Sequence, residues 1–309
     1  MTYQEIIEGI KSLQIQGAEK IAVAAVQAFA LKLEETKNMS EPDHTATAAN
    51  QSTPSATRAA ILQQSYQELA TTRATEPALR NALRYCLQNY QQNPDVTNFV
   101  INYFSESKKK IAEFGAKKIQ NGMIIFTHCH SSTVEDILAE ALKQGKKFTV
   151  YNTETRPKFQ GRITAQNIAK LGIPVVHFVD SAARNFMKKA DLFLFGCDAV
   201  SAEGKIYNKI GTAMIADYAH QNNVPAYSCT NSWKFDPETI NGAEEIIEER
   251  DSKEVWDNPP PGVTIKNPAF EIVNPDIVTG IITELGIFKP ETLVTEVQKA
   301  YPWLVETQL

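Results

Sequence analysis

The feature that most constrains the fold is an alternation of short apolar runs with helical patterns, which begins after Gly122. Each run has the length of a β-strand, and several are rich in β-branched or aromatic residues. The runs are MIIFT, KFTVYN, PVVHFV, ADLFLFG and PAYSCT. Helical spacing fills the segments between them, at residues 134–144, 164–171, 181–189 and 212–222. Strands that alternate with helices predict βαβ units and a doubly wound parallel sheet with helices on both faces.

The first part of the chain has a different pattern. Apolar residues such as Ile6, Ile10 and Leu13 recur at helical spacing. We therefore expect a helical N-terminal domain over residues 1–119 and an α/β domain over residues 120–309, since 309 residues suffice for two ordinary domains. Small polar residues and prolines interrupt the helical pattern at about 40–56, which predicts a mobile loop.

Composition excludes several classes of protein. The 43% apolar and 22% charged residues are typical of a globular protein, and a net charge of −5 offers nucleic acid no basic field. No apolar run approaches the ~20 residues that span a bilayer, and the polar start does not resemble a signal peptide. The four cysteines lack paired zinc spacing and a dense disulfide pattern, which favours free thiols in a reducing cytoplasm. Neither G-x-G-x-x-G after the first strand nor G-x-x-x-x-G-K-[ST] is present, so a nucleotide cofactor is unsupported.

Polar side chains follow the apolar runs, where a parallel sheet binds its ligands. In such a sheet the ligand site lies beyond the carboxyl ends of the strands. The segments at these ends are THCH, TETR, DS, CD and TN, at residues 127–130, 153–156, 180–181, 197–198 and 230–231. The sequence thus predicts that titratable groups meet at one rim of the sheet.

Cys129 is the first candidate for chemistry. Ser132 and Glu135 form S-x-x-E, which predicts a capping box and a helix that begins near Ser132. Cys129 then lies just before a helix N-terminus, which favours a thiolate and also a bound phosphate. A buried thiol without a task is the alternative. A metal site made of Cys129 with His128 and His130 is disfavoured, because consecutive strand residues point to opposite faces.

Asp198 and the segment after it are the second candidate. An acid directly after an apolar strand is partly desolvated, which favours its neutral form and suits it to donate a proton; a turn-capping acid is the alternative. Glu203 and Gly204 then predict a hairpin turn. Asn208 and Lys209 follow and precede a new helix, which together suggest a phosphate cradle, with a solvated lysine as the alternative.

Other charged residues lie near the predicted rim. Glu154 and Arg156 are close enough in sequence to form an ion pair that shapes the site. Lys234 stands beside two aromatic residues after the PAYSCT run. The helical half offers Arg73 and two further arginines, of which at least one is expected to reach into the cleft.

Read in order, a set of motifs resembles a known superfamily: ribose-1,5-bisphosphate isomerase, methylthioribose-1-phosphate isomerase and the regulatory subunits of translation initiation factor 2B. The motifs are AEFGAKK, THCHSS, TETRPKFQG, VDSAAR, GCDAV, NKIGT, WKFDPET and NPAFEIVNPDIVTGIITELGI. The resemblance covers nearly all of the chain from about Ala112 onward and is looser before it. It implies a Rossmann-like domain preceded by a helical one, a homodimer or homohexamer, and no metal or redox cofactor.

The resemblance also assigns roles to residues. Isomerases of this superfamily carry a catalytic cysteine and a catalytic aspartate at positions that match Cys129 and Asp198, whereas the regulatory subunits generally lack the pair. The enzymes similar to this chain convert a ribose 1-phosphate, such as ribose 1,5-bisphosphate, into a ribulose phosphate. Asp198 would protonate the ring oxygen, and a Cys129 thiolate would move a proton from C2 to C1; a hydride shift is the alternative. The same match implies that substrate is bound by Gly17, Ala18, Arg73, Ser131, Ser132, Asn208, Lys209 and Lys234.

One loop departs from the pattern. The superfamily opens its first phosphate loop with Arg-Gly-Ala-Gly, whereas this chain has Gln16 and Glu19 at the ends of the loop and Lys20 after it. A bidentate arginine contact to phosphate is therefore absent, which leaves the substrate less constrained than the chemistry. Two other functions stay open: a regulatory module that binds a nucleotide or sugar phosphate, and a redox pair of Cys129 and Cys197.

Overall fold

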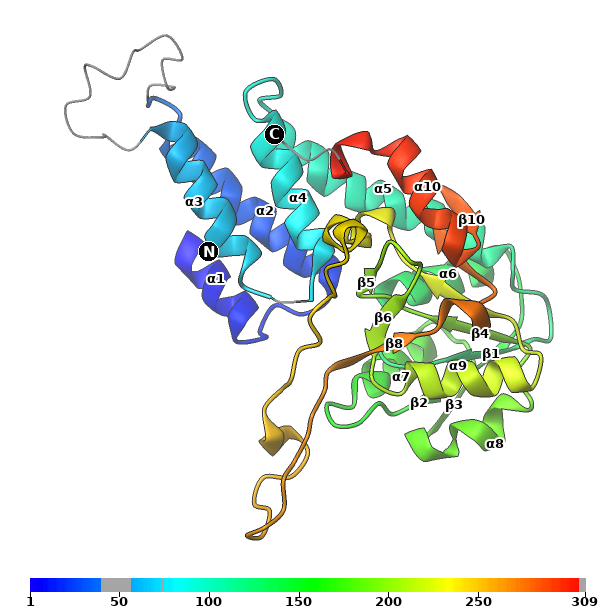
Figure 1. Cartoon of the computed structure of the whole chain (residues 1–309). Helices are drawn as coiled ribbons and strands as arrows, with labels where there is room; N and C mark the ends of the chain where they lie inside the picture. The colour runs from blue at the N-terminus through cyan, green and yellow to red at the C-terminus, as the bar shows by residue number, and fades with distance from the viewer. Residues whose placement is uncertain (40–56, 74, 306–309) are drawn as a thin grey trace. The chain divides into compact units, whose positions relative to one another are not determined.

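The computed structural model describes residues 1–39, 57–73 and 75–305 (Figure 1). The loop expected at 40–56 lies outside the described residues. By its contacts the chain divides into two compact units, Met1–Phe104 and Ser105–Leu309. Within the described ranges, no helix combines the length and the apolarity that crossing a lipid bilayer requires.

The first unit consists of helices in its described residues. They are α1 (Tyr3–Lys11), α2 (Ala18–Glu35), α3 (Arg58–Ala70), α4 (Pro77–Asn89) and the first part of α5 (Val96–Ala116). Thr2 and Glu5 form a capping box at the start of α1, and Pro77 occupies the first turn of α4, where its missing N–H costs no hydrogen bond. α2 contacts α1, α3 and α4 and buries Ile21 and Phe29 completely, so it is the central helix of this unit.

The second unit is built on a seven-stranded sheet of order β10-β9-β7-β4-β1-β2-β3. Its strands are β1 (Ile124–Thr127), β2 (Thr149–Thr153), β3 (Val175–Phe178), β4 (Leu192–Phe195), β7 (Ala226–Cys229), β9 (Gly280–Thr283) and β10 (Gly286–Phe288). Every neighbouring pair is parallel except β9 and β10. The predicted mixed α/β fold with a mostly parallel sheet is confirmed. The strand order reverses between β1 and β4, and ligands bind at such a switch point in open α/β sheets.

Helices connect the strands and cover the sheet. They are α6 (Ser132–Lys143), α7 (Gln160–Lys170), α8 (Ala183–Met187), α9 (Thr212–Gln221) and α10 (Pro290–Ala300). β4 is buried at all four positions, as expected for a strand covered on both faces. Ile111 and Ala116 of α5 belong to the same apolar core as Ile125 of β1 and Ile137 of α6. Because the second half of α5 packs on the sheet, the division between units lies inside this helix, earlier than the boundary expected after residue 119.

A second, antiparallel sheet adjoins the rim. It contains β5 (Ala199–Val200), β6 (Ile206–Lys209) and β8 (Phe270–Val273). The predicted hairpin turn at Glu203 and Gly204 joins β5 to β6, with Gly204 at φ +77°. Between the 3₁₀ turn Pro237–Asn241 and β8, residues 242–268 form a long excursion, visible in Figure 1.

Gly161 fixes the approach of α7 to β2, and its replacement by alanine is expected to destabilise the second unit. A Cβ at this position would lie 1.8 Å from the backbone oxygen of Thr153. Helix propensity alone would make the alanine variant more stable by about 1 kcal/mol. The clash with Thr153 would make it less stable, so the sign of the change in the free energy of unfolding shows which effect is larger. We expect Gly161→Ala to cost about 3 kcal/mol and to lower the melting temperature by roughly 6–12 °C.

The exposed Gln166 of the same helix supplies the control. Gln166→Ala is expected to change the free energy of unfolding by less than about 0.5 kcal/mol. Calorimetry of both variants measures the difference. A Gly161→Ala variant as stable as the parent protein would contradict the close approach.

Candidate active site

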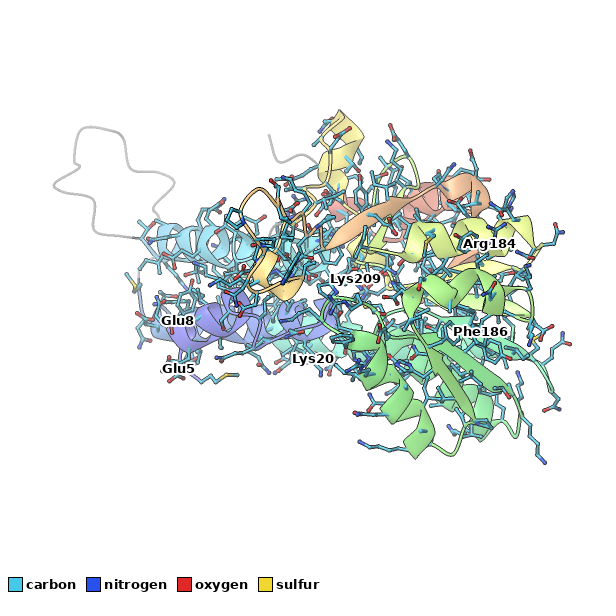
Figure 2. All side chains as sticks on the ribbon, turned by 90° about the horizontal axis from the view of Figure 1, so that it is seen from below. Glu5, Glu8, Lys20, Arg184, Phe186 and Lys209 are labelled. Carbon is cyan, nitrogen blue, oxygen red and sulfur yellow. The ribbon has the colours of Figure 1, made fainter. Side chains whose placement is uncertain are left out.

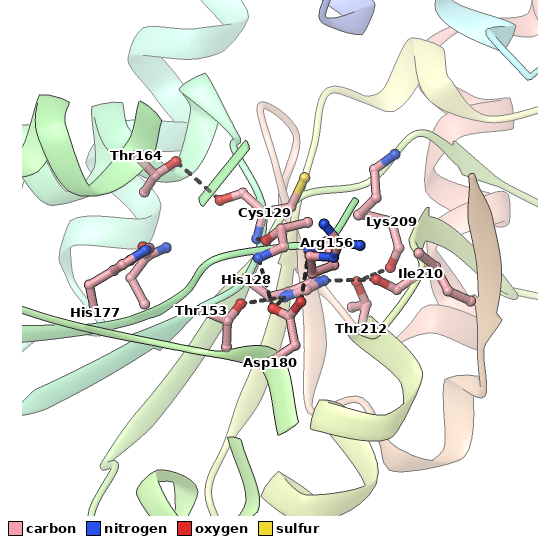
Figure 3. A network of polar contacts seen from close by, with 12 residues as sticks. His128, Cys129, Thr153, Arg156, Thr164, His177, Asp180, Lys209, Ile210 and Thr212 are labelled. Atoms are coloured by element: carbon pink, nitrogen blue, oxygen red, sulfur yellow. Dashed lines mark hydrogen bonds and ion pairs between the residues drawn. The ribbon is translucent and has the colours of Figure 1, made fainter. Parts of the chain in front are cut away.

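Cys129 lies at the carboxyl end of β1 in a strained conformation. Its φ is +67°, in the left-handed region that non-glycine residues seldom adopt. Its backbone N–H donates to Thr155 Oγ1 at 2.9 Å, and its carbonyl accepts from Thr164 Oγ1 at 3.1 Å (Figure 3). The loop after β2 and helix α7 thus hold the cysteine in place. Such enforced strain is common at functional sites.

This strain predicts an order of stability between two variants. Cys129→Ala keeps a Cβ in the left-handed region, whereas Cys129→Gly removes it. Although glycine loses more chain entropy on folding, we expect the Gly variant to be more stable than the Ala variant by about 1 kcal/mol. Urea unfolding of both proteins gives the comparison. An Ala variant at least as stable as the Gly variant would show that the backbone is not strained.

The start of α6 differs from the prediction by one residue. Ser131 is the N-cap, and its Oγ accepts from the N–H of Val134 at 3.3 Å. Ser132 is the first helical residue. Glu135 lies 3.1 Å from His130 Nδ1 and takes no part in a capping box. The predicted box of Ser132 and Glu135 is therefore wrong, because the extended backbone of Ser131 already supplies the cap.

The protonation state of Cys129 also differs from the prediction. Burial raises the pKa of its thiol to about 11, although the ammonium group of Lys209 and a hydrogen bond from the backbone of His130 lower it. The carboxyl groups of Asp198 and Asp180 raise the pKa further. The resting form of Cys129 at neutral pH is therefore the thiol, and the thiolate expected from the sequence is a minor species. Burial of the sulfur outweighs its place near a helix N-terminus.

The raised pKa predicts how the thiol reacts with iodoacetamide. With a pKa near 11, about 10⁻⁴ of the thiol is ionised at pH 7, and this fraction rises tenfold per pH unit. We expect the alkylation rate at Cys129 to rise about tenfold per unit from pH 7 to 9.5 without a plateau. Mass spectrometry locates the label, and Cys129→Ala is the control. A plateau below pH 8 would show that the thiol ionises near neutrality.

His128 points into the interior beside Cys129 and is 1% exposed. Its Nε2 lies 2.9 Å from the carbonyl oxygen of Ile210, and its Nδ1 lies 2.6 Å from Thr153 Oγ1. Because a carbonyl oxygen only accepts, Nε2 carries the hydrogen and Nδ1 accepts from the threonine hydroxyl. Burial lowers the pKa of His128, so the ring is neutral even with Asp180 Oδ1 4.0 Å from Nδ1.

The turn after β2 is organised by Asp180, which follows β3. Asp180 accepts from the backbone N–H groups of Thr155 at 2.8 Å and Arg156 at 2.7 Å. These bonds fix the hydroxyl of Thr155 that holds Cys129. Glu154 forms its ion pair with Arg162, at 3.3 Å, so the expected pair of Glu154 with Arg156 is wrong. Gly161 N donates to the carbonyl of Glu154 at 3.2 Å, so the first turn of α7 places Arg162 near Glu154.

Asp198 and the ammonium group of Lys234 both lie at the carboxyl end of β4. The backbone N–H of Asp198 donates to the carbonyl of Tyr207 at 2.8 Å, and its side chain is partly buried. Lys234 Nζ donates to the carbonyl of Cys197. The Cys197 thiol donates to the carbonyl of Ala199 at 3.1 Å, and burial raises its pKa to about 12. A lysine and a carboxyl group thus share one strand end, next to the end of β1.

Close packing brings Ser131 and Asn208 to the same strand end. A Cβ on Gly196 would lie 3.1 Å from Ser131 Oγ and 3.7 Å from Asn208 Oδ1. Asn208 Nδ2 donates to Thr212 Oγ1 at 3.0 Å, at the start of α9. The N-termini of α6 and α9 therefore lie near one glycine, and helix N-termini favour anions.

Lys209 is the cation of this group. Its side chain is buried, and its Nζ lies 4.7 Å from the centre of the Phe270 ring. Figure 3 shows the side chains of Lys209 and Cys129 extending to the same side of the rim. A buried ammonium over an aromatic face is favourable, and its charge acts on the thiol.

Three predicted binding residues lie in the first unit. Gly17 precedes α2 at φ +91°, Ala18 is buried as the first residue of that helix, and Arg73 is buried between α3 and α4. Gln16 Nε2 donates to the carbonyl of Leu13 at 2.6 Å, so its amide turns back onto its own loop. The exposed Lys20 lies near the start of α2 (Figure 2).

Sequence reasoning placed the rim correctly but missed the residues that hold Cys129. Thr155 lies in the TETR segment, which the sequence places at the rim, but nothing in the sequence indicates that this residue holds Cys129. Thr164 belongs to a helix and carries no signal of this contact. His128 was considered only as a metal ligand. Its apolar surroundings, in a run that ends MIIFTH, were the available indication of a buried ring.

A parallel sheet whose carboxyl rim carries a buried thiol, a carboxyl group and a buried lysine defines an α/β protein with a candidate active site. Comparison with known proteins then places the chain: it belongs to the initiation factor 2 subunit family, whose profile matches residues 14–290. Ribose 1,5-bisphosphate isomerase of Thermococcus kodakarensis is 38% identical, over 98% of this chain and 95% of that protein. Methylthioribose-1-phosphate isomerase of Dehalococcoides mccartyi is 31% identical, over 94% and 90%. Among solved structures, translation initiation factor eIF-2B of Pyrococcus horikoshii matches with a TM-score of 0.78 and 26% identity, over 93% of this chain and 97% of that one.

Proposed function

We propose that this chain is an aldose–ketose isomerase that converts ribose 1,5-bisphosphate into ribulose 1,5-bisphosphate in the cytoplasm. The observation that carries the proposal is the pairing of Cys129 and Asp198 at the ends of the adjacent strands β1 and β4. Ser131, Asn208 and Lys209 surround this pair with groups that suit a phosphate. The most similar of the relatives named above carries the name of this activity.

The first step of the proposed reaction opens the sugar ring. Asp198, as the carboxylic acid, donates its proton to the ring oxygen, and the bond from C1 to that oxygen breaks. The electron pair of the bond stays on oxygen, so C1 becomes an oxocarbenium centre that still carries the phosphate. This positive centre acidifies the hydrogen on C2.

The second step moves a proton between the two carbons. The Cys129 thiolate removes the hydrogen from C2, which gives an enol with a double bond between C1 and C2. The resulting thiol then returns a proton to C1, while the Asp198 carboxylate takes the proton of the 2-hydroxyl and the ketone forms. Both side chains end in their starting states, and only protons have moved.

The high pKa of Cys129 is compatible with this role. A thiolate whose conjugate acid has a pKa of about 11 is rare at pH 7, yet it is a stronger base toward carbon than a thiolate of lower pKa. Lys209 is the cation that favours the ionised sulfur. The high pKa thus lowers the fraction of Cys129 that is present as thiolate but makes each thiolate a stronger base.

Direct turnover tests the proposal. Purified protein is incubated separately with ribose 1,5-bisphosphate, methylthioribose 1-phosphate and ribose 1-phosphate, and products are followed by phosphorus NMR. We expect ribulose 1,5-bisphosphate from the first compound and slower or no turnover of the others. Failure to convert any of the three would overturn the enzyme assignment.

A regulatory role is the second candidate, because Gln16 and Glu19 replace the arginine and glycine of the first phosphate loop and a solved relative is named as an initiation factor. Such a module would bind a nucleotide or sugar phosphate without consuming it. Calorimetry combined with phosphorus NMR separates the two roles. Tight binding of intact ligand, with recovery of initiation factor 2 in a pull-down, would favour regulation.

We further propose that Gly17, Ala18 and Arg73 of the helical first unit, Met1–Phe104, bind substrate, and that the protein is a homodimer or homohexamer. The proposal rests on the resemblance and on the helices of the first unit. Light scattering is expected to give two or six times the chain mass of 34.4 kDa. A particle of 34.4 kDa would exclude both assemblies.

A further inference from the structure

Asn208 and Lys209 end strand β6, which pairs with β5 and β8, and the next residue, Ile210, is held from two sides. On one side, Ile210 N donates to the carbonyl of Ala269 at 3.2 Å, which ties the segment to the strand β8 region. On the other side, the carbonyl of Ile210 accepts from Nε2 of His128 at 2.9 Å. The histidine that donates this second bond directly precedes Cys129 in the chain, and Figure 3 shows the bond running from its ring to Ile210.

We infer that His128 is a positioning residue. Its hydrogen bond to Ile210 ties the end of β6, which carries Lys209, to the end of β1, beside Cys129, and so fixes where the Lys209 ammonium group lies relative to the thiol. The catalytic consequence rests on the proposed function, whereas the effect on the thiol does not.

The packing around the ring supports this role. Gly211 has φ +99°, and a Cβ on it would lie 3.0 Å from His128 Nε2. The backbone of the loop therefore lies directly on the imidazole, with no side chain between them. A side chain at position 211 would therefore push the loop away from the imidazole.

His128 itself does not transfer protons in this arrangement. Both ring nitrogens are engaged, one with Ile210 and one with Thr153. The ring is 1% exposed and neutral, so substrate cannot reach it. The charged groups that act on Cys129 are Lys209, Asp198 and Asp180, and of these His128 contacts the loop of Lys209 and lies 4.0 Å from Asp180.

Two amide substitutions separate the effect of losing the hydrogen bond to Ile210 from the effect of losing the imidazole ring. His128→Gln places an amide N–H near the position of Nε2 and keeps a donor for Ile210. His128→Asn is one carbon shorter, so its amide reaches only the position of Nδ1 and the bond to Ile210 is lost. Both variants remove the imidazole and keep a side-chain amide, so they differ mainly in where that amide lies.

The measurement is the rate at which iodoacetamide alkylates Cys129 in the full-length protein, between pH 7 and 9.5. We expect His128→Gln to remain within about twofold of the parent and His128→Asn to react about tenfold more slowly, because a rise of one unit in the pKa of the thiol lowers its ionised fraction about tenfold. Lys209→Met, which removes the ammonium group itself, is expected to slow the reaction by a similar factor. In turnover, the Asn variant is expected to lose kcat more than KM. Equal rates for the parent and the Asn variant, or equal slowing of the Gln and Asn variants, would overturn the inference.

Gly211→Ala provides a second route if the histidine variants do not fold. Its Cβ displaces the same loop while His128 is intact, so alkylation of Cys129 is again expected to slow, and an unchanged rate would contradict the inference.

The alkylation rates also distinguish the proposed isomerase from the proposed role of His128. A protein whose variants show the expected alkylation rates but which converts no sugar phosphate refutes the isomerase. An active protein whose variants do not show these rates refutes only the role of His128.

Discussion

Cys129→Ala is expected to lower kcat/KM for ribose 1,5-bisphosphate by about 10²- to 10⁴-fold, because it removes the proposed base that carries the proton from C2 to C1. The backbone bonds to Thr155 and Thr164 involve only main-chain atoms of Cys129, so the variant keeps them. The fold around the site should therefore survive. Steady-state kinetics and circular dichroism on the same preparation measure both effects.

Cys229 offers a matched control for this experiment. It is also a buried, free cysteine, and it ends the core strand β7, which is separated from β1 by β4. Cys229→Ala removes the same sulfur atom from the interior and is expected to cost stability of similar size while turnover stays within about threefold. A Cys129→Ala enzyme within tenfold of the parent would show that the thiol is not the base.

Deuterium distinguishes the two possible ways of moving hydrogen. If Cys129 carries the proton, reaction in D₂O is expected to place solvent deuterium at C1 of the product in a measurable fraction of turnovers. A direct hydride shift would retain the hydrogen of C2 quantitatively. Complete retention, together with high activity of Cys129→Ala, would replace the proton route with the hydride route.

Five of the seven strands were predictable because their signal is local, whereas β9 and β10 were not predicted as strands. β1, β4 and β7 are apolar runs of strand length, and the segments between strands have helical spacing. The start of α6 was less certain because Ser131 and Ser132 are adjacent and both can cap a helix. The strained backbone of Cys129, which depends on contacts with distant loops, directs the chain so that Ser131 becomes the cap.

The candidate site was predictable in position but not in electrostatics. Cys129 and Asp198 stand out because each directly follows an apolar strand, and strand ends meet at one rim. The pKa of the thiol depends on its burial and on Lys209, eighty residues away, so the short stretch around the cysteine could not show that the thiol is the predominant form and the thiolate a minor one. Likewise, Glu154 pairs with Arg162 instead of Arg156 because the loop folds back along α7.

Asp198→Asn is the second variant with a large expected effect, a loss of about 10²- to 10⁴-fold in kcat. Asparagine has the same shape as aspartic acid but no acidic proton to give to the ring oxygen. The backbone N–H of residue 198 donates to the carbonyl of Tyr207, and this bond is unaffected. The exposed Asp217 on α9 provides the control, and Asp217→Asn is expected to retain full turnover.

An isotope effect identifies the step that Asp198 serves. With ribose 1,5-bisphosphate deuterated at C2, the parent enzyme is expected to show a primary isotope effect, because the bond from C2 to hydrogen breaks in the second step. In Asp198→Asn, ring opening becomes slower than this step, so the isotope effect should fall toward unity. An undiminished effect in a slow Asp198→Asn enzyme would place Asp198 at the carbon proton transfer instead. Since the two side chains act in sequence on one molecule, the double variant with Cys129→Ala should lose far less than the product of the two single losses.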